Sequence, residues 1–109
     1  MNKGNKEEII KGSGNIFEDL GFDNSEEMLF KAELVSLING VISKRKLTQA
    51  KAAKQIGATQ NDVSKLFNGK LDGFSVERLF KFLTSLDRDI NISVNKTTRK
   101  AGGRIAIAA

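Results

Sequence analysis

The sequence predicts a mainly α-helical domain that ends in a short β-strand or hairpin. Three observations support this fold class. Apolar residues recur at helical spacing along residues 25–46 and 75–88. Two short amphipathic segments between them, residues 48–57 and 59–69, each begin with a threonine and end with a glycine. From residue 89 apolar and polar residues alternate, which is the period of a strand.

Composition limits the classes of protein to consider. The chain has 109 residues, enough for one domain with a modest core. It contains no Cys and no His, and no carboxylate pair lies within an apolar pattern. We therefore expect no enzyme and no bound metal or cofactor. It also lacks a run of 18 apolar residues and a signal peptide, so a cytoplasmic protein without a membrane partner is expected.

Charge is divided unevenly along the chain. The net charge is +5, yet residues 1–30 hold three Lys against seven Asp and Glu, which leaves +9 for residues 31–109. A basic body fits a polyanionic partner. The acidic leading part either binds a basic protein or is only a soluble tail.

Composition and periodicity divide the chain into three parts. Residues 1–24 are expected to be a partly disordered arm, in which Ile16, Phe17 and Leu20 are spaced for one turn of helix. Residues 25–88 form the helical domain, and residues 89–109 form a C-terminal β element.

The first helix is expected to begin at Ser25, with Glu26 and Glu27 in its first turn, where carboxylates favour the positive end of the helix dipole. Its core-facing stripe is expected to contain Met28, Leu29, Ala32, Val35, Leu37, Ile38, Val41 and Ile42. The helix closes with Lys44, Arg45 and Lys46, which suit the negative end of the dipole and could also contact phosphates.

Residues 47–69, LTQAKAAKQIGATQNDVSKLFNG, predict two short helices joined by a tight turn. Thr48 and Thr59 are placed to cap helices over residues 49–56 and 60–68. Gly57 and Gly69 follow those helices, where a left-handed residue ends a helix at least cost. Small residues are expected where the two helices nearly touch, and the sequence has Ala50, Ala52 and Ala53.

The second of these helices has one apolar and one polar face. Val63, Leu66 and Phe67 share the apolar face. The other face carries hydrogen-bonding side chains, with Gln60 at its tip: Asn61, Ser64, Lys65 and Asn68. Such side chains read base edges and contact phosphates. A solvated surface helix is the alternative, but it would more often carry Glu–Lys pairs four residues apart.

The last helix is expected to be capped by Ser75, with Val76, Leu79, Phe80, Leu83 and Leu86 pointing inward. Phe82 is expected to pack on the segment that follows. In that segment Ile90, Ile92 and Val94 alternate with polar residues, and Ile105 and Ile107 repeat the pattern weakly. A lone strand leaves its edges unpaired, so we expect pairing with a second chain through Ile90, Ile92 and Val94, or a hairpin folded back on the helices.

Residues 47–69 closely resemble the Xre/Cro-type helix-turn-helix, whose pattern is LTQ, two alanine-like positions, a glycine turn, a Ser/Thr-Gln start and a terminal NG. With GNIFEDLGF (residues 14–22) and GFSVERLFKFLTSLDRDINISV (residues 73–94), the chain resembles HigA-type antitoxins of toxin–antitoxin operons. The resemblance implies a homodimeric repressor that binds a palindromic operator, autoregulates its operon and neutralises a basic RelE-like ribonuclease toxin. The alternative is a stand-alone Xre-family regulator without a toxin.

The resemblance also assigns DNA contacts. Gln49 should hold a phosphate, and Gln60 and Asn61 should reach base edges. Ser64 and Lys65 should lie along the groove, and Thr59 and Asn68 complete the expected set. Asp62 is acidic on a surface expected to meet DNA, so it either accepts a hydrogen bond from a cytosine amine or helps to cap the helix.

Overall fold

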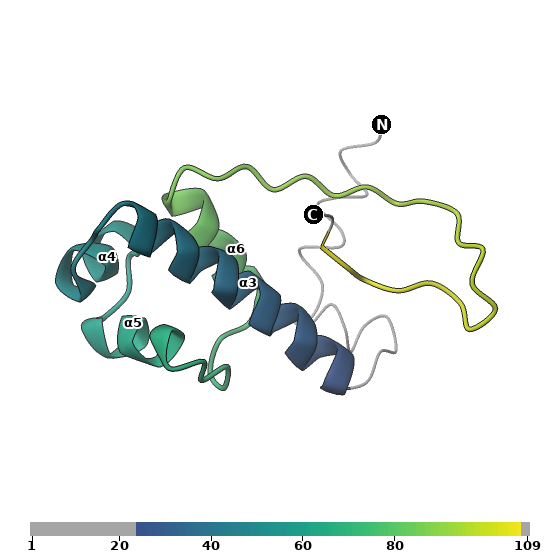
Figure 1. The fold of residues 1–109 in the computed structure, drawn as a ribbon, viewed down its shortest axis with the longest axis horizontal. Coiled ribbons are helices and arrows are strands. Elements are labelled where there is room, and N and C mark those ends of the chain that lie inside the picture. Colours follow the sequence, from purple (N-terminus) through teal and green to yellow (C-terminus); the bar gives the residue numbers. More distant parts are fainter. Residues whose placement is uncertain (1–23, 108–109) are drawn as a thin grey trace.

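The computed structural model describes residues 24–107, which contain four α-helices. The long helix α3 (Asn24–Lys44) is followed by α4 (Gln49–Ile56), α5 (Gln60–Phe67) and α6 (Val76–Ser85). Figure 1 shows α4 and α5 grouped near the C-terminal end of α3, with α6 alongside α3. Residues 89–107 run as an extended chain past the opposite end of α3.

The four helices enclose one apolar core between them. Each helix contributes one face, because apolar residues three or four apart lie on the same side of a helix. Among the described residues no polar or charged residue is buried. The largest side chains with almost no exposed surface are Ile38, Ile42, Val63, Leu66, Leu79 and Leu86.

The core-facing stripe of α3 differs from the predicted one. Val35, Ile38, Val41 and Ile42 are buried as expected, but Met28, Leu29, Ala32 and Leu37 are exposed. Phe30 and Leu34 are buried instead. The sequence offers apolar residues around most of the first half of this helix, so periodicity alone did not select the face. The buried face is selected by contacts with the other helices. One such contact is between the rings of Phe30 and Phe80, which meet edge-on with their centroids 6.3 Å apart.

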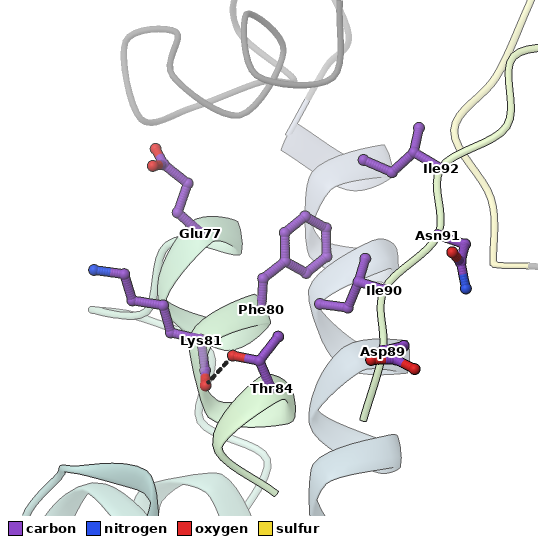
Figure 2. A pocket seen from close by; sticks show the side chains of 8 residues that line it. All are labelled: Glu77, Phe80, Lys81, Thr84, Asp89, Ile90, Asn91 and Ile92. Atoms are coloured by element: carbon purple, nitrogen blue, oxygen red, sulfur yellow. Dashed lines mark hydrogen bonds between the residues drawn. The ribbon is translucent and has the colours of Figure 1, made fainter. Parts of the chain in front are cut away.

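Phe82 also packs differently from the prediction. It is buried against the residues that precede α6 rather than those that follow it, with its ring 6.1 Å from that of Phe74 at an interplanar angle of 73°. Phe80 is the half-buried one, and it faces the segment after α6 (Figure 2). Within α4–α5, Ala50 and Phe67 are exposed although an inward position was expected for both.

The predicted C-terminal β-strand or hairpin is wrong: residues 24–107 contain no strand. The alternation does select a face, because Ile90 and Ile92 point toward Phe80 whereas Asn91 points away (Figure 2). A strand, however, also needs a second backbone to hydrogen-bond with, and residues 89–95 and 104–107 form no ladder with each other. Val94 is 84% exposed, so the apolar face does not continue.

Arg45 joins the C-terminal ends of the two long supporting helices. Its guanidinium donates to the carbonyl oxygen of Leu86 at 2.7 Å and to the carboxylate of Asp87 at 3.2 Å. The phosphate contact considered for this residue therefore competes with an existing structural role. Lys44 and Lys46 remain exposed.

The acidic arm, with Ile16, Phe17 and Leu20, lies outside the described residues. None of the helices within residues 24–107 is long and apolar enough to cross a membrane.

Candidate nucleic-acid interface

The turn between α4 and α5 is built by the threonines and the glycine that the sequence predicted. The Thr48 hydroxyl accepts from the Lys51 backbone N–H at 3.1 Å. Gly57 ends α4 with φ of +70°, a conformation that costs a glycine little. The Ala58 backbone N–H then donates to the carbonyl oxygen of Ala53 at 2.9 Å, which closes the helix end.

The N-terminus of α5 has a reciprocal cap. The Thr59 hydroxyl accepts from the Asp62 backbone N–H at 3.0 Å, and the Thr59 backbone N–H donates to the Asp62 carboxylate at 3.2 Å. The oxygen of Thr59 is thus engaged, although its hydroxyl proton can still be donated. Of the two roles considered for Asp62, capping is the one that the geometry confirms.

Arg78 of α6 also binds Asp62. One guanidinium nitrogen donates to the same carboxylate oxygen at 3.0 Å. The guanidinium carbon lies 5.3 Å from the ring centroid of Phe74 and 5.2 Å from that of Phe82, within cation–π range of both. The two rings fix Arg78, and Arg78 fixes the first turn of α5. The Thr59 N–H, and after it Arg78, hold the pKa of the Asp62 carboxyl below its usual range.

The C-terminal end of α5 is held from the other side, by Asn39 of α3. The Asn39 amide donates to the carbonyl oxygen of Leu66 at 2.9 Å. The same carbonyl accepts from the Gly69 backbone N–H at 3.1 Å. The carbonyl groups of a last helical turn lack partners within the helix, so these donors satisfy one of them.

These contacts and the core fix which face of α5 is outward. Val63 and Leu66 have no exposed surface, so the helix cannot rotate about its axis without leaving a cavity. The hydrogen bond from Arg78 links the start of α5 to α6, and the hydrogen bond from Asn39 links its end to α3.

The seven predicted DNA-contact residues are distributed as follows. Gln49 is the first residue of α4 and is exposed. Thr59 caps α5, and Asn68 follows its last residue. The remaining residues are spaced to share one face of α5; Gln60 and Asn61 are exposed, whereas Ser64 and Lys65 are half-buried. An amide N–H of Asn68 lies 3.5 Å from the Ser64 hydroxyl, which is too long to hold either side chain firmly.

Sequence reasoning missed Arg78, Phe74 and Asn39. A signal existed for Arg78, because Arg78 and Phe82 are four residues apart on the last predicted helix, and side chains at that spacing meet on a helix face. Phe74 precedes the cap of that helix, so the same spacing rule does not apply to it. Asn39 also gave a signal, since it is a polar residue at the edge of the apolar stripe of α3. Neither signal identifies the partner on α5.

A separate, open groove of about 410 Å³ lies between α6 and residues 89–92. Its apolar lining consists of Phe80, Ile90 and Ile92 (Figure 2). Its polar rim includes Glu77 and Lys81 of α6. The groove includes none of the predicted DNA contacts, but it does hold two of the three residues expected at a dimer interface.

Comparisons with known proteins agree with this geometry. Residues 16–95 match the family model described as a helix-turn-helix domain. A solved structure whose name assigns it to the XRE family of transcriptional regulators has 43% sequence identity and a TM-score of 0.75. The alignment covers 80% of this chain and 99% of the solved one. No curated protein matches the sequence. The chain therefore belongs to the helix-turn-helix domain family, with a motif of the Xre type.

Proposed function

We propose that the protein is a sequence-specific DNA-binding repressor that binds a palindromic operator as a homodimer. The observation that carries the proposal is the polar face of α5, which is held at both ends of the helix while Gln60 and Asn61 stay exposed. The family match and the XRE-named structure support a DNA-binding transcriptional regulator rather than an enzyme. Repression follows if the dimer blocks access to the operator.

In this proposal α5 enters the major groove. Gln60 and Asn61 read base edges, because an amide pairs with adenine through two hydrogen bonds. Lys65 and Ser64 lie along the groove wall, Gln49 holds a phosphate at the start of α4, and Thr59 and Asn68 contact the backbone at the two ends of α5. Two copies of α5 must then lie about 34 Å apart, in successive turns of the groove.

For the dimer contact we propose Ile90, Ile92 and Val94. Val94 is 84% exposed, and the two isoleucines are only half-buried along an open groove. A second copy would remove this apolar surface from water. The groove lies on α6, whereas the DNA-contact residues lie on α4 and α5, so a copy seated there leaves the reading face accessible.

Substitution on α5 tests the readout. Sites selected from random duplexes would serve as the DNA, and Kd would be measured for each variant. Gln60→Ala should weaken binding to the selected site by about 1–3 kcal/mol and relax sequence preference. Lys65→Ala should weaken all sequences alike and reduce the salt dependence by about one ion per chain. Gln55→Ala is the matched control, because Gln55 is an exposed glutamine of α4 outside the proposed contacts. Equal affinity of wild type and Gln60→Ala/Asn61→Ala would refute the assignment.

We further propose that the protein is the antitoxin of a toxin–antitoxin pair; a stand-alone Xre-family regulator is the alternative. The support is the resemblance in residues 14–22 and 73–94, together with the net charge of −4 in residues 1–30. A RelE-like ribonuclease binds RNA and so needs a basic surface, which an acidic segment can cover. The neighbour named as an XRE regulator agrees with either alternative.

Co-expression with the product of the adjacent reading frame distinguishes an antitoxin from a stand-alone regulator. Deletion of residues 1–24 should abolish capture and neutralisation of the toxin while operator binding persists. Deletion of residues 1–12 is the control, because that stretch holds three Lys and two Glu and spares Ile16, Phe17 and Leu20. If the protein that lacks residues 1–24 still captures the toxin, the toxin contact must lie on the helical body. An adjacent reading frame that encodes no toxin would favour the stand-alone regulator.

A further inference from the structure

We propose that residues 96–104, here named the basic loop, are a second DNA-binding element that contacts phosphates flanking the bases under α5. This inference rests on the proposed DNA binding, and it concerns a part of the chain that the reading helix does not include. The loop supplies charge rather than base recognition.

The charge of the C-terminal segment is of one sign. Asp89 is the last acidic residue of the sequence, and four cations follow it: Lys96, Arg99, Lys100 and Arg104. All four side chains are exposed. The ion pairs formed among residues 24–107 are Lys31–Glu27, Arg45–Asp87 and Arg78–Asp62, so no carboxylate of the described part neutralises the loop. These four positive charges compare with a net charge of +5 for the whole chain.

The loop is tethered at both ends. Ile90 packs against the core before it, and Ile105 and Ile107 pack against the core after it. Between these anchors the backbone makes one turn, in which the Gly102 N–H donates to the carbonyl oxygen of Arg99 at 3.2 Å. Gly102 has φ of +95°, a value that side-chain-bearing residues rarely adopt. The sequence thus builds a turn that holds Arg99 and Lys100 out from the helical body.

The composition of the loop selects the class of partner. Residues 96–104 contain no aromatic residue, which a single-stranded nucleic acid needs for base stacking. They also contain no apolar side chain larger than alanine, whereas protein interfaces need an apolar centre. Cations without apolar neighbours suit the phosphates of a duplex, where each neutralised phosphate releases counterions.

The position of the loop selects the part of the duplex. Figure 1 shows it at the end of the molecule opposite α4 and α5. The longest dimension of the molecule is 44 Å, and one turn of B-DNA is about 34 Å. A duplex that runs along this dimension meets the loop beyond the base pairs that α5 reads.

Two double variants with the same change in charge test the proposal. Arg99→Gln/Lys100→Gln alters the loop. Arg88→Gln/Lys54→Gln removes one exposed Arg and one exposed Lys from the helical body, neither of which is a proposed DNA contact or lines the groove. Both would be measured on a selected site in a duplex that holds both half-sites and about one further helical turn on each side. Thermal unfolding would show that both variants fold.

The loop variant should bind this duplex roughly tenfold more weakly than wild type, with a salt slope smaller by about 2 per chain. Its sequence preference should match that of wild type, and the body variant should lose less affinity. The proposal is overturned if both variants lose equally, or if the loop variant relaxes sequence preference as Gln60→Ala is expected to. Wild-type protein that selects no site would instead refute the proposed function, and this inference with it.

Discussion

The structures of α4–α5 and of the segment after α6 were both predicted from local sequence patterns, yet only the helices of α4–α5 are found in the structure. In α4–α5 each signal carries its own partner within three or four residues, such as Thr59 with Asp62. The alternation of Ile90, Ile92 and Val94 needs a partner strand that residues 24–107 do not supply. A sequence pattern is therefore most informative when the residues that must contact each other are only a few positions apart.

The largest expected effect concerns the segment after α6, because a second chain could supply the partner that this segment lacks within residues 24–107. Val94→Asp puts a charge on an exposed apolar residue and should leave the fold intact while weakening self-association. Loss of avidity between two half-sites should lower operator affinity by about 10²–10⁴. Ser93→Asp is the matched control, since Ser93 is also exposed. Sedimentation of both variants decides the point, and a Val94→Asp protein that stays dimeric would place the interface elsewhere.

The core of α5 should respond far more strongly than the exposed segment to loss of an apolar side chain. Leu66 is fully buried, so Leu66→Ala should lower the free energy of unfolding by about 2–5 kcal/mol. In the monomer, Val94→Ala removes a side chain that is 84% exposed and should change the free energy of unfolding by less than about 0.5 kcal/mol. Denaturant unfolding at protein concentrations too low for dimers measures this difference, and similar losses would mean that the segment is buried within the single chain.

The two regions also offer a threonine each for comparison. Thr59 caps α5, and Thr59→Ala should lower the free energy of unfolding by about 1 kcal/mol. Thr97 accepts from the Arg99 backbone N–H at 3.0 Å in the basic loop. Because that loop contributes no helix, Thr97→Ala should leave the unfolding midpoint unchanged. A shift of the midpoint in Thr97→Ala would show that the loop is coupled to the helical body.

The smallest effect is the pH dependence that Asp62 confers. Its pKa is lowered in the folded protein, so its stabilising contribution is full above the unfolded value and is lost as pH falls through the folded value. Wild type and Asp62→Asn should therefore differ most in unfolding free energy near neutral pH and converge at acidic pH. Asp89→Asn, in the exposed segment, serves as the comparison. A constant difference between wild type and Asp62→Asn would assign the effect to packing instead.

Much of the helical domain could be predicted from sequence. Thr48, Thr59 and Ser75 cap the helices as expected, because a cap needs only a side chain and an amide three residues later. The start of α3 differs from the prediction by one residue, at Asn24 instead of Ser25.

What could not be predicted depends on contacts between distant residues. Asn39 and Leu66 are 27 positions apart, and Asp62 and Arg78 are 16 apart. The face of α3 was misassigned for the same reason, because apolar residues such as Leu29 surround its first half and only the packing partners distinguish them. Helix periodicity specifies a face when one side is polar, and here neither side was polar enough.

The contact from Arg45 to Leu86 and Asp87 has a consequence for how the chain folds. It joins positions 41 and 42 residues apart, and the whole of α4 and α5 lies between them. Closing a loop of that length costs entropy before any contact repays it, and eight-residue helices are unstable alone in water. We therefore expect α4 and α5 to acquire lasting structure only when α3 and α6 meet. Folding should be a single cooperative step, with no populated species in which the reading helix is formed on an open chain.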